Sequence, residues 1–290
     1  FAELYADQNE RDYAELLASL QAGGTYPAQR RGFAAKAYAH TSAYDGQITQ
    51  WLSPRAADPE TPEAWPHTFN LSLGLASSLR YGENPHQRGA LYLERNAPQG
   101  IVATARFLQG KELSYNNLAD ADAALECVKA FDAPACVIVK HANPCGVAVA
   151  ADLMTAYDRA FAVDPTSAFG GIIAFNCEVD GALASTIIER QFVEVLLATA
   201  FAPEALAALA RKPNIRVLAT GPLHTSRPPA LRVEQIEGGM LVQDSDVAVL
   251  PANALRVVSK RQPTAAELAD ARLAWSLVRF VKSNAILFVR

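Results

Sequence analysis

The stretch Ala135-Cys136-Val137-Ile138-Val139-Lys140-His141-Ala142-Asn143-Pro144-Cys145-Gly146 decides the fold of this chain. Its first five residues are apolar and rich in β-branched side chains, and proline and glycine follow. This pattern predicts a buried strand over residues 135–139 rather than a helix. Ligands of open α/β sheets bind at the carboxyl ends of strands, and histidine titrates near neutral pH. Lys140 and His141 therefore stand where a catalytic pair is expected.

Predicted strands and helices alternate along the chain around this stretch. Strands are predicted over residues 171–175, 193–198, 215–219 and 285–289, and helices over 120–131, 152–162, 181–191, 203–211 and 264–282. The strands are apolar throughout rather than at every second residue, which indicates a sheet covered by helices on both faces. We therefore predict the α/β class, with a parallel or mixed sheet.

The first part of the chain has a different character. Residues 12–21 and 30–52 carry apolar residues at helical spacing, which predicts two helices. The candidate core positions of the second helix are Phe33, Ala37, Tyr38, Tyr44, Ile48 and Trp51. Residues 53–66 are rich in proline, and we interpret them as a linker. A strand over residues 71–75 and a polar loop over 80–88 follow.

Composition places the chain among globular proteins. Half of its residues are hydrophobic and 19% are charged, and the formal net charge of -4 gives no basic field for nucleic acid. No apolar stretch reaches transmembrane length and no signal-peptide pattern opens the chain, so we expect no membrane partner and a cytoplasmic location. The cysteines form no Cys-x-x-Cys pair, so we expect neither a disulfide framework nor a metal site.

The chemistry expected of Lys140 and His141 is proton transfer. His141 acts as a base if it reaches the acidic proton, and Lys140 supplies positive charge to a developing oxyanion. Neighbours on a continuing strand point to opposite faces, so both reach one ligand only if the strand ends and the chain turns. Pro144 and Gly146 favour such a turn. A structural histidine beside a solvent-facing lysine is the equal alternative.

Four other segments carry candidate ligand groups. Arg80 and Tyr81 precede Gly82, and an Arg-Tyr-Gly run suits a phosphate and a sugar or base, although a solvated polar loop is the more common reading. Gly170 allows close backbone approach to a ligand, or merely a tight loop. Glu194 either binds ligand hydroxyls or points to solvent, and Asn284 either reads a ligand amide or caps a helix.

Six segments in this order resemble the family of bifunctional purine-biosynthesis proteins that join AICAR transformylase and IMP cyclohydrolase. The resembling segments are Arg30 to Asp45, Leu79 to Gln87, Leu108 to Asn117, Val139 to Gly146, Asp164 to Gly171 and Val281 to Asn284. The resemblance implies a cytidine-deaminase-like, three-layer transformylase unit over residues 67–290. A mainly helical remnant of the cyclohydrolase domain and a linker, residues 1–66, precede it. We therefore expect a fragment of a longer, homodimeric protein.

The resemblance also implies a reaction and its site residues. A formyl group passes from 10-formyltetrahydrofolate, the co-substrate, to the 5-amino group of AICAR, without a metal. By motif matching, His141 is the base that takes the amine proton and Lys140 stabilises the transition state. The residues matched to the AICAR site are Arg80, Tyr81, Gly170, Glu194 and Asn284.

Two other classes of function compete with this interpretation. A zinc nucleoside deaminase needs a Pro-Cys-x-x-Cys signature, which fails here because Gly146-Val147-Ala148 follows Cys145. The second alternative is a truncated, non-catalytic chain that binds nucleotide or serves as a dimerisation scaffold. Activity that depends on His141 separates that alternative from the enzyme.

Overall fold

The computed structural model describes residues 2–223, 231–251 and 254–290. The chain divides into two compact units, of which the first comprises Phe1–Ala76 with Tyr92–Asn96 and the second Ser77–Leu91 with Ala97–Arg290. The predicted domain boundary at residues 66 and 67 rests on the proline-rich stretch before it and on the resemblance, and it stays a prediction.

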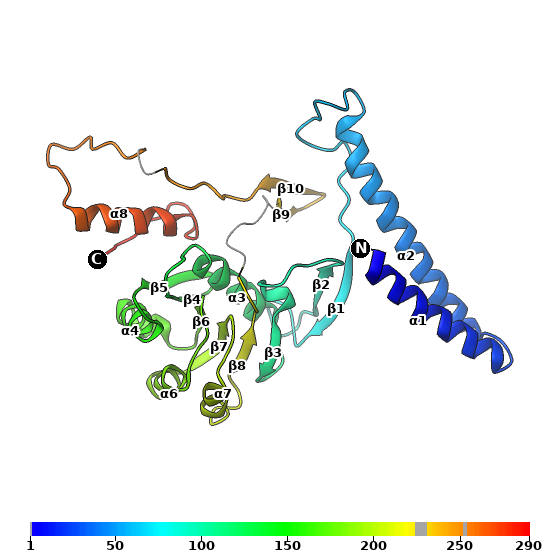
Figure 1. The fold of residues 1–290 in the computed structure, drawn as a ribbon, viewed down its shortest axis with the longest axis horizontal. Helices are drawn as coiled ribbons and strands as arrows, with labels where there is room; N and C mark the ends of the chain where they lie inside the picture. The colour runs from blue at the N-terminus through cyan, green and yellow to red at the C-terminus, as the bar shows by residue number, and fades with distance from the viewer. Residues whose placement is uncertain (1, 224–230, 252–253) are drawn as a thin grey trace. The chain divides into compact units, whose positions relative to one another are not determined.

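The second unit is built on a six-stranded mixed sheet (Figure 1). The parallel strands lie at its centre, where β6 pairs with β7 and β7 with β8. Antiparallel strands flank them, because β4 pairs with both β5 and β6, and β3 pairs with β8. The order across the sheet is β3 (Arg106–Gln109), β8 (Arg216–Ala219), β7 (Val193–Ala198), β6 (Gly171–Phe175), β4 (Ala135–Lys140) and β5 (Asn143–Val149).

Helices cover both faces of this sheet, which makes three layers. Successive strand residues point to opposite faces, so Ile138 joins the core under one set of helices and Val137 the core under the other. The first core is covered by α4 (Leu153–Val163), α6 (Gly181–Arg190) and α7 (Pro203–Leu209). The second core is covered by α3 (Tyr115–Val128) and α8 (Ala265–Val278). The prediction of a three-layer α/β unit is confirmed.

The first unit consists mainly of α1 (Ala2–Gln21) and α2 (Pro27–Leu52), followed by the short 3-10 helix η1 (Ser53–Arg55). Both helices were predicted, but the predicted core of α2 is wrong. Tyr38, Tyr44, Ile48 and Trp51 are all exposed, and Ala43 is the residue that α2 buries. A pair of helices presents too little apolar surface to enclose large side chains on its own.

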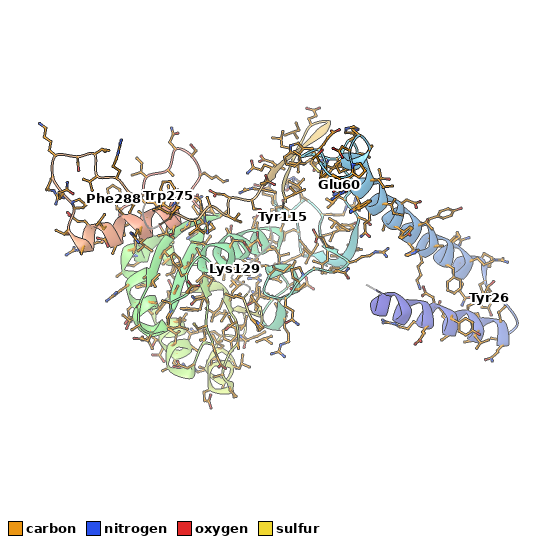
Figure 2. The ribbon with its side chains drawn as sticks, turned by 45° about the horizontal axis from the view of Figure 1, so that its top comes forward. Tyr26, Glu60, Tyr115, Lys129, Trp275 and Phe288 are labelled. Atoms are coloured by element: carbon orange, nitrogen blue, oxygen red, sulfur yellow. The ribbon has the colours of Figure 1, made fainter. Side chains whose placement is uncertain are left out.

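Several sequence predictions need correction in their boundaries. The strand predicted over residues 71–75 is β1 (Leu73–Leu79), which pairs with β2 (Gly89–Glu94) in a two-stranded sheet. The helix predicted over residues 264–282 ends at Val278. The strand predicted over residues 285–289 is absent from this described segment, although Leu287 packs on the second core. Phe288 beside it is exposed (Figure 2).

Short elements complete the described chain. A 3-10 turn, η2 (Val102–Thr104), precedes β3, and the one-turn helix α5 (Pro165–Ala168) precedes β6. A separate hairpin pairs β9 (Leu231–Ile236) with β10 (Gly239–Asp244). No helix within residues 2–223, 231–251 and 254–290 is both long and apolar enough to cross a membrane.

Candidate functional site

Lys140 and His141 lie at the tip of a tight β-hairpin. β4 ends at Lys140, which pairs with Asn143 at the start of β5, so His141 and Ala142 form a two-residue connection. Both have positive φ, 54° for His141 and 57° for Ala142, as a type I′ hairpin turn requires. The predicted end of the strand after Lys140 and the predicted turn are both present. The turn comes before Pro144, however, and not at Pro144 and Gly146.

Hydrogen bonds from three elements fix this tip. Asp120 of α3 accepts the N–H of Ala142 at 2.8 Å, and the Asn143 amide donates to the His141 carbonyl at 2.9 Å. The Lys140 ammonium donates to the carbonyl of Phe169 at 2.7 Å. Burial raises the pKa of Asp120, while the backbone N–H groups of Ala142 and His141 and the charge of His141 oppose that rise. The tip is thus held in place while the His141 side chain stays exposed.

The Lys140 contact brings the tip to the loop that contains Gly170. Gly170 has a φ of 71°, a conformation that favours glycine, and its N–H donates to the Phe192 carbonyl at 2.8 Å. The rings of Phe169 and Phe192 lie 5.7 Å apart between centroids. Gly170 therefore belongs to the same local structure as Lys140.

Glu194 lies on a bulge of β7, the strand that pairs with β6. Gly171 pairs with Val193 and Ile172 with Val195, so Glu194 is the extra residue between them. Its carboxylate accepts a hydrogen bond at 2.7 Å from Arg216, whose side chain is only 7% exposed. Arg216 also donates to the Glu112 carbonyl at 3.0 Å. The structure therefore gives Glu194 an ion pair, a partner that sequence analysis missed.

The loop with Arg80 and Tyr81 is joined to the start of α3. The N–H of Arg80 donates to Leu113, the carbonyl of Tyr81 accepts the N–H of Tyr115, and the Asn116 amide donates to Glu83. The Arg80 guanidinium lies 5.6 Å from the centre of the Tyr81 ring. Because Glu112 in turn accepts from Arg216, this loop belongs to the same network as Glu194.

Sheet topology explains why these segments meet. β3 and β4 end, and β6, β7 and β8 begin, at one edge of the mixed sheet, because β3 and β4 run antiparallel to the other three. The candidate residues therefore stand at both carboxyl and amino ends of strands, and their role in ligand binding stays a prediction. Gly170 and Glu194 occupy the amino ends of β6 and β7, whereas Lys140 occupies the carboxyl end of β4.

Asn284 lies in a different setting from the other predicted site residues. It follows α8 in an exposed segment and accepts a hydrogen bond from the Ser283 hydroxyl at 3.2 Å. Its role at the nucleotide site stays a prediction.

Two residues of the network escaped sequence analysis. The helix predicted over residues 120–131 placed Asp120 at its first position, but α3 starts earlier, with Ser114 as its N-cap and Asn117 completing the capping box. Tyr115, the first helical residue, is labelled in Figure 2. The Ser-x-x-Asn spacing was the signal for that cap. Arg216, inside an apolar strand, was a visible signal for a buried ion pair.

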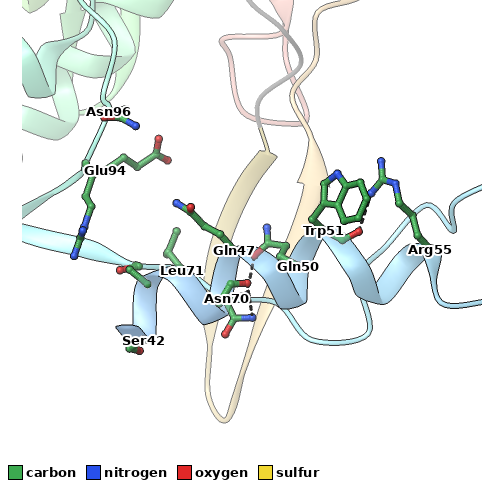
Figure 3. A pocket seen from close by; sticks show the side chains of 13 residues that line it. Ser42, Gln47, Gln50, Trp51, Arg55, Asn70, Leu71, Glu94 and Asn96 are labelled. Carbon is green, nitrogen blue, oxygen red and sulfur yellow. Dashed lines mark hydrogen bonds between the residues drawn. The ribbon is translucent and has the colours of Figure 1, made fainter. Parts of the chain in front are cut away.

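A hollow of the first unit lies apart from these residues in the sequence. It has a volume of about 580 Å³ and a polar lining, in which the Asn70 side-chain amide donates to the Gly46 carbonyl at 3.3 Å and the Asn70 backbone N–H donates to the Gln50 side-chain oxygen at 3.1 Å (Figure 3). Within the described ranges, no group of three or more histidine, cysteine or acidic residues is arranged to hold a metal ion.

These observations define an α/β protein whose candidate site lies at one edge of a mixed sheet. A sequence model of the AICARFT/IMPCHase bienzyme family matches residues 5–290. The chain belongs to this family, whose two activities are AICAR formyl transfer and IMP cyclohydrolysis in purine biosynthesis. The family resemblance drawn from the sequence is confirmed.

Proposed function

We propose that this chain carries the formyl-transfer site of its family, which moves a formyl group from 10-formyltetrahydrofolate to the 5-amino group of AICAR. The observation that supports this most is the hairpin tip. A lysine ends β4 and a histidine starts the turn that follows; α3 holds the turn through Ala142, and the Gly170 loop holds the lysine. Fixed placement of this kind is what acid–base chemistry on a weak nucleophile requires.

The proposed reaction begins at the AICAR amine. His141 takes one amine proton as the nitrogen attacks the formyl carbon, and the carbonyl electrons move to the formyl oxygen. The Lys140 ammonium stabilises that oxyanion. When the oxyanion collapses, the bond to the folate N10 breaks, and the proton that His141 took passes to N10 as tetrahydrofolate leaves. The Phe169 carbonyl accepts one of the three Lys140 protons, which leaves the others for substrate.

The proposed AICAR contacts use the other candidate residues near this end of the mixed sheet. Arg80 is exposed and offers a planar donor fork to the phosphate, with Tyr81 under its guanidinium. The Gly170 backbone permits close approach, and the Glu194 carboxylate accepts from ribose hydroxyls while Arg216 holds it. We assign Asn284 to the same nucleotide on motif matching alone.

The wider assignment follows the family as well. We propose that residues 1–66 belong to the cyclohydrolase part and residues 67–290 to the transformylase part, in a cytoplasmic homodimer. The proposed partners are the two small-molecule substrates, without nucleic acid, membrane or metal.

The test is formyl transfer by the purified chain at high protein concentration, with wild type, His141→Ala and His67→Ala compared. His67 is an exposed histidine outside all six motif segments and serves as the matched control. The proposal expects turnover that His141→Ala lowers by at least a hundredfold, in the range typical of general-base removal, and that His67→Ala largely retains. AICAR binding without turnover in the wild type would instead identify a non-catalytic nucleotide-binding fragment.

A further inference from the structure

The turn that carries His141 adopts a conformation that its sequence disfavours. His141 and Ala142 both have positive φ, and the sequence that usually fills such a turn is Asn-Gly. An alanine has no side chain that compensates for the left-handed conformation. Such strain persists only when the surrounding structure fixes the chain, and it collects at functional sites.

Asp120 provides a fixing contact from outside the hairpin. Its carboxylate accepts the N–H of Ala142 at 2.8 Å. Asp120 sits on α3 directly before the fully buried Ala121, and Ala124 and Leu125 anchor the same helix in the second core. The acceptor is therefore attached to a helix that cannot shift without disturbing the core.

The other contacts at the tip act differently. Asn143 bonds the His141 carbonyl from within the hairpin, so it moves with the turn. Lys140 bonds the Phe169 carbonyl, which fixes the end of β4 rather than the two residues of positive φ. The bond to Asp120 ties the left-handed pair itself to the body of the unit.

We propose that Asp120 is a positioning residue, which clamps the left-handed turn through the Ala142 N–H and thereby aims the His141 imidazole at the substrate. The kinetic consequence rests on the proposed function, whereas the clamp itself does not. The chemistry of Asp120 agrees with this role. Burial raises its pKa, which means that keeping the carboxylate charged costs folding free energy. The hydrogen bond from the Ala142 N–H offsets part of that cost.

Three variants separate a clamp from other roles. Asp120→Ala removes the acceptor. Asp120→Asn keeps an acceptor oxygen in the same place and removes the charge. Asp120→Ala combined with Ala142→Gly removes the acceptor but supplies a residue that adopts positive φ without strain. Ala142→Gly alone is the reference for the double variant.

The first measurement is hydrogen exchange of the Ala142 amide, followed by NMR together with the ring resonances of His141. The clamp predicts that Asp120→Ala speeds exchange by about ten- to a hundredfold, the range expected for loss of a hydrogen bond to a charged group. It predicts shifted His141 ring resonances and a nearly unchanged thermal midpoint. Asp120→Asn stays near wild type. Unchanged exchange in Asp120→Ala would overturn the clamp, whether or not the chain is an active enzyme.

The second measurement is formyl transfer. The clamp predicts that Asp120→Ala lowers kcat by about ten- to a hundredfold with KM for AICAR within about threefold, and that Ala142→Gly restores most of the loss. If Asp120→Asn is as defective as Asp120→Ala and Ala142→Gly restores nothing, Asp120 acts by its charge and the clamp is wrong. If the wild type shows no transfer, the proposed function fails for this chain, and the exchange data alone decide about the clamp.

Discussion

Replacing Arg216 by methionine tests how the sheet edge is held together. Arg216→Met keeps the aliphatic bulk of a nearly buried side chain and removes its guanidinium. Two hydrogen bonds are lost, one to the Glu194 carboxylate at 2.7 Å and one to the Glu112 carbonyl at 3.0 Å. The variant therefore isolates the polar part of the contact.

The magnitude follows from the exposure of the partners. A hydrogen bond between charged groups contributes about 1.5–3 kcal/mol and one to a neutral carbonyl about 0.5–1.5 kcal/mol. The Glu194 side chain is 36% exposed and can be rehydrated, so the lower part of each range applies. We expect a loss of about 2–3 kcal/mol, which for a domain of about 200 residues lowers Tm by about 4–12 °C.

The matched control is Arg211→Met. Arg211 pairs with Glu189 at 3.4 Å, and both side chains are more than half exposed. Such surface pairs contribute little, so we expect a change within about 0.5 kcal/mol. Urea unfolding and thermal melting measure both variants. Equal effects of Arg216→Met and Arg211→Met would refute the reasoning that burial makes the Arg216 contact strong.

Three further predictions concern other parts of the second unit. Gly146→Ala places a Cβ at 2.1 Å from the Ala160 carbonyl of α4, so we expect a loss of at least about 2 kcal/mol in urea unfolding; an effect below 0.5 kcal/mol would contradict this packing. Burial raises the pKa of the Cys145 thiol to about 11, so at pH 8 its alkylation, followed by mass spectrometry, is expected to be slower than that of a free cysteine by a factor on the order of a hundred. Hydrogen bonds from Arg261 lower the pKa of Glu267 to about 2. The stabilisation of the start of α8 is therefore complete above the ordinary glutamate pKa and is lost as the pH falls toward 2, and NMR titration should place the Glu267 midpoint near 2, moving up in Arg261→Met.

Sequence reasoning predicted the central strands because their physics is local. Residues 135–139 and 171–175 are continuous apolar runs bounded by turn residues, and residues 193–198 are apolar except for Glu194; each forms a strand of the sheet. Burial on both faces leaves no alternation to misinterpret. The helices between them were predicted from apolar residues at helical spacing, which is also a local pattern.

The missed elements depend on partners that the local sequence does not reveal. β5 contains Pro144 and Gly146, which suggested a turn, yet Gly146 is required there because the backbone of α4 passes against it. The run over residues 285–289 has strand composition but no strand in this described segment, and a strand needs an edge to pair with. Composition alone cannot supply that information.

The candidate site was predicted residue by residue, whereas its connections were not. The motifs identified Lys140, Gly170 and Glu194, but not that Lys140 bonds the residue before Gly170 or that Arg216 holds Glu194. These contacts join residues far apart in the sequence, so only the sheet topology places them together. The contact of Asp120 with the hairpin tip was missed for the same reason.

The most direct test of the central claim is an NMR titration of the isotope-labelled, 31.1 kDa chain with AICAR. If the motif segments form one nucleotide site, the amide resonances of Tyr81, His141, Gly170 and Glu194 shift together along a single binding curve. Shifts confined to the first unit, or no shifts at millimolar AICAR, would contradict the account.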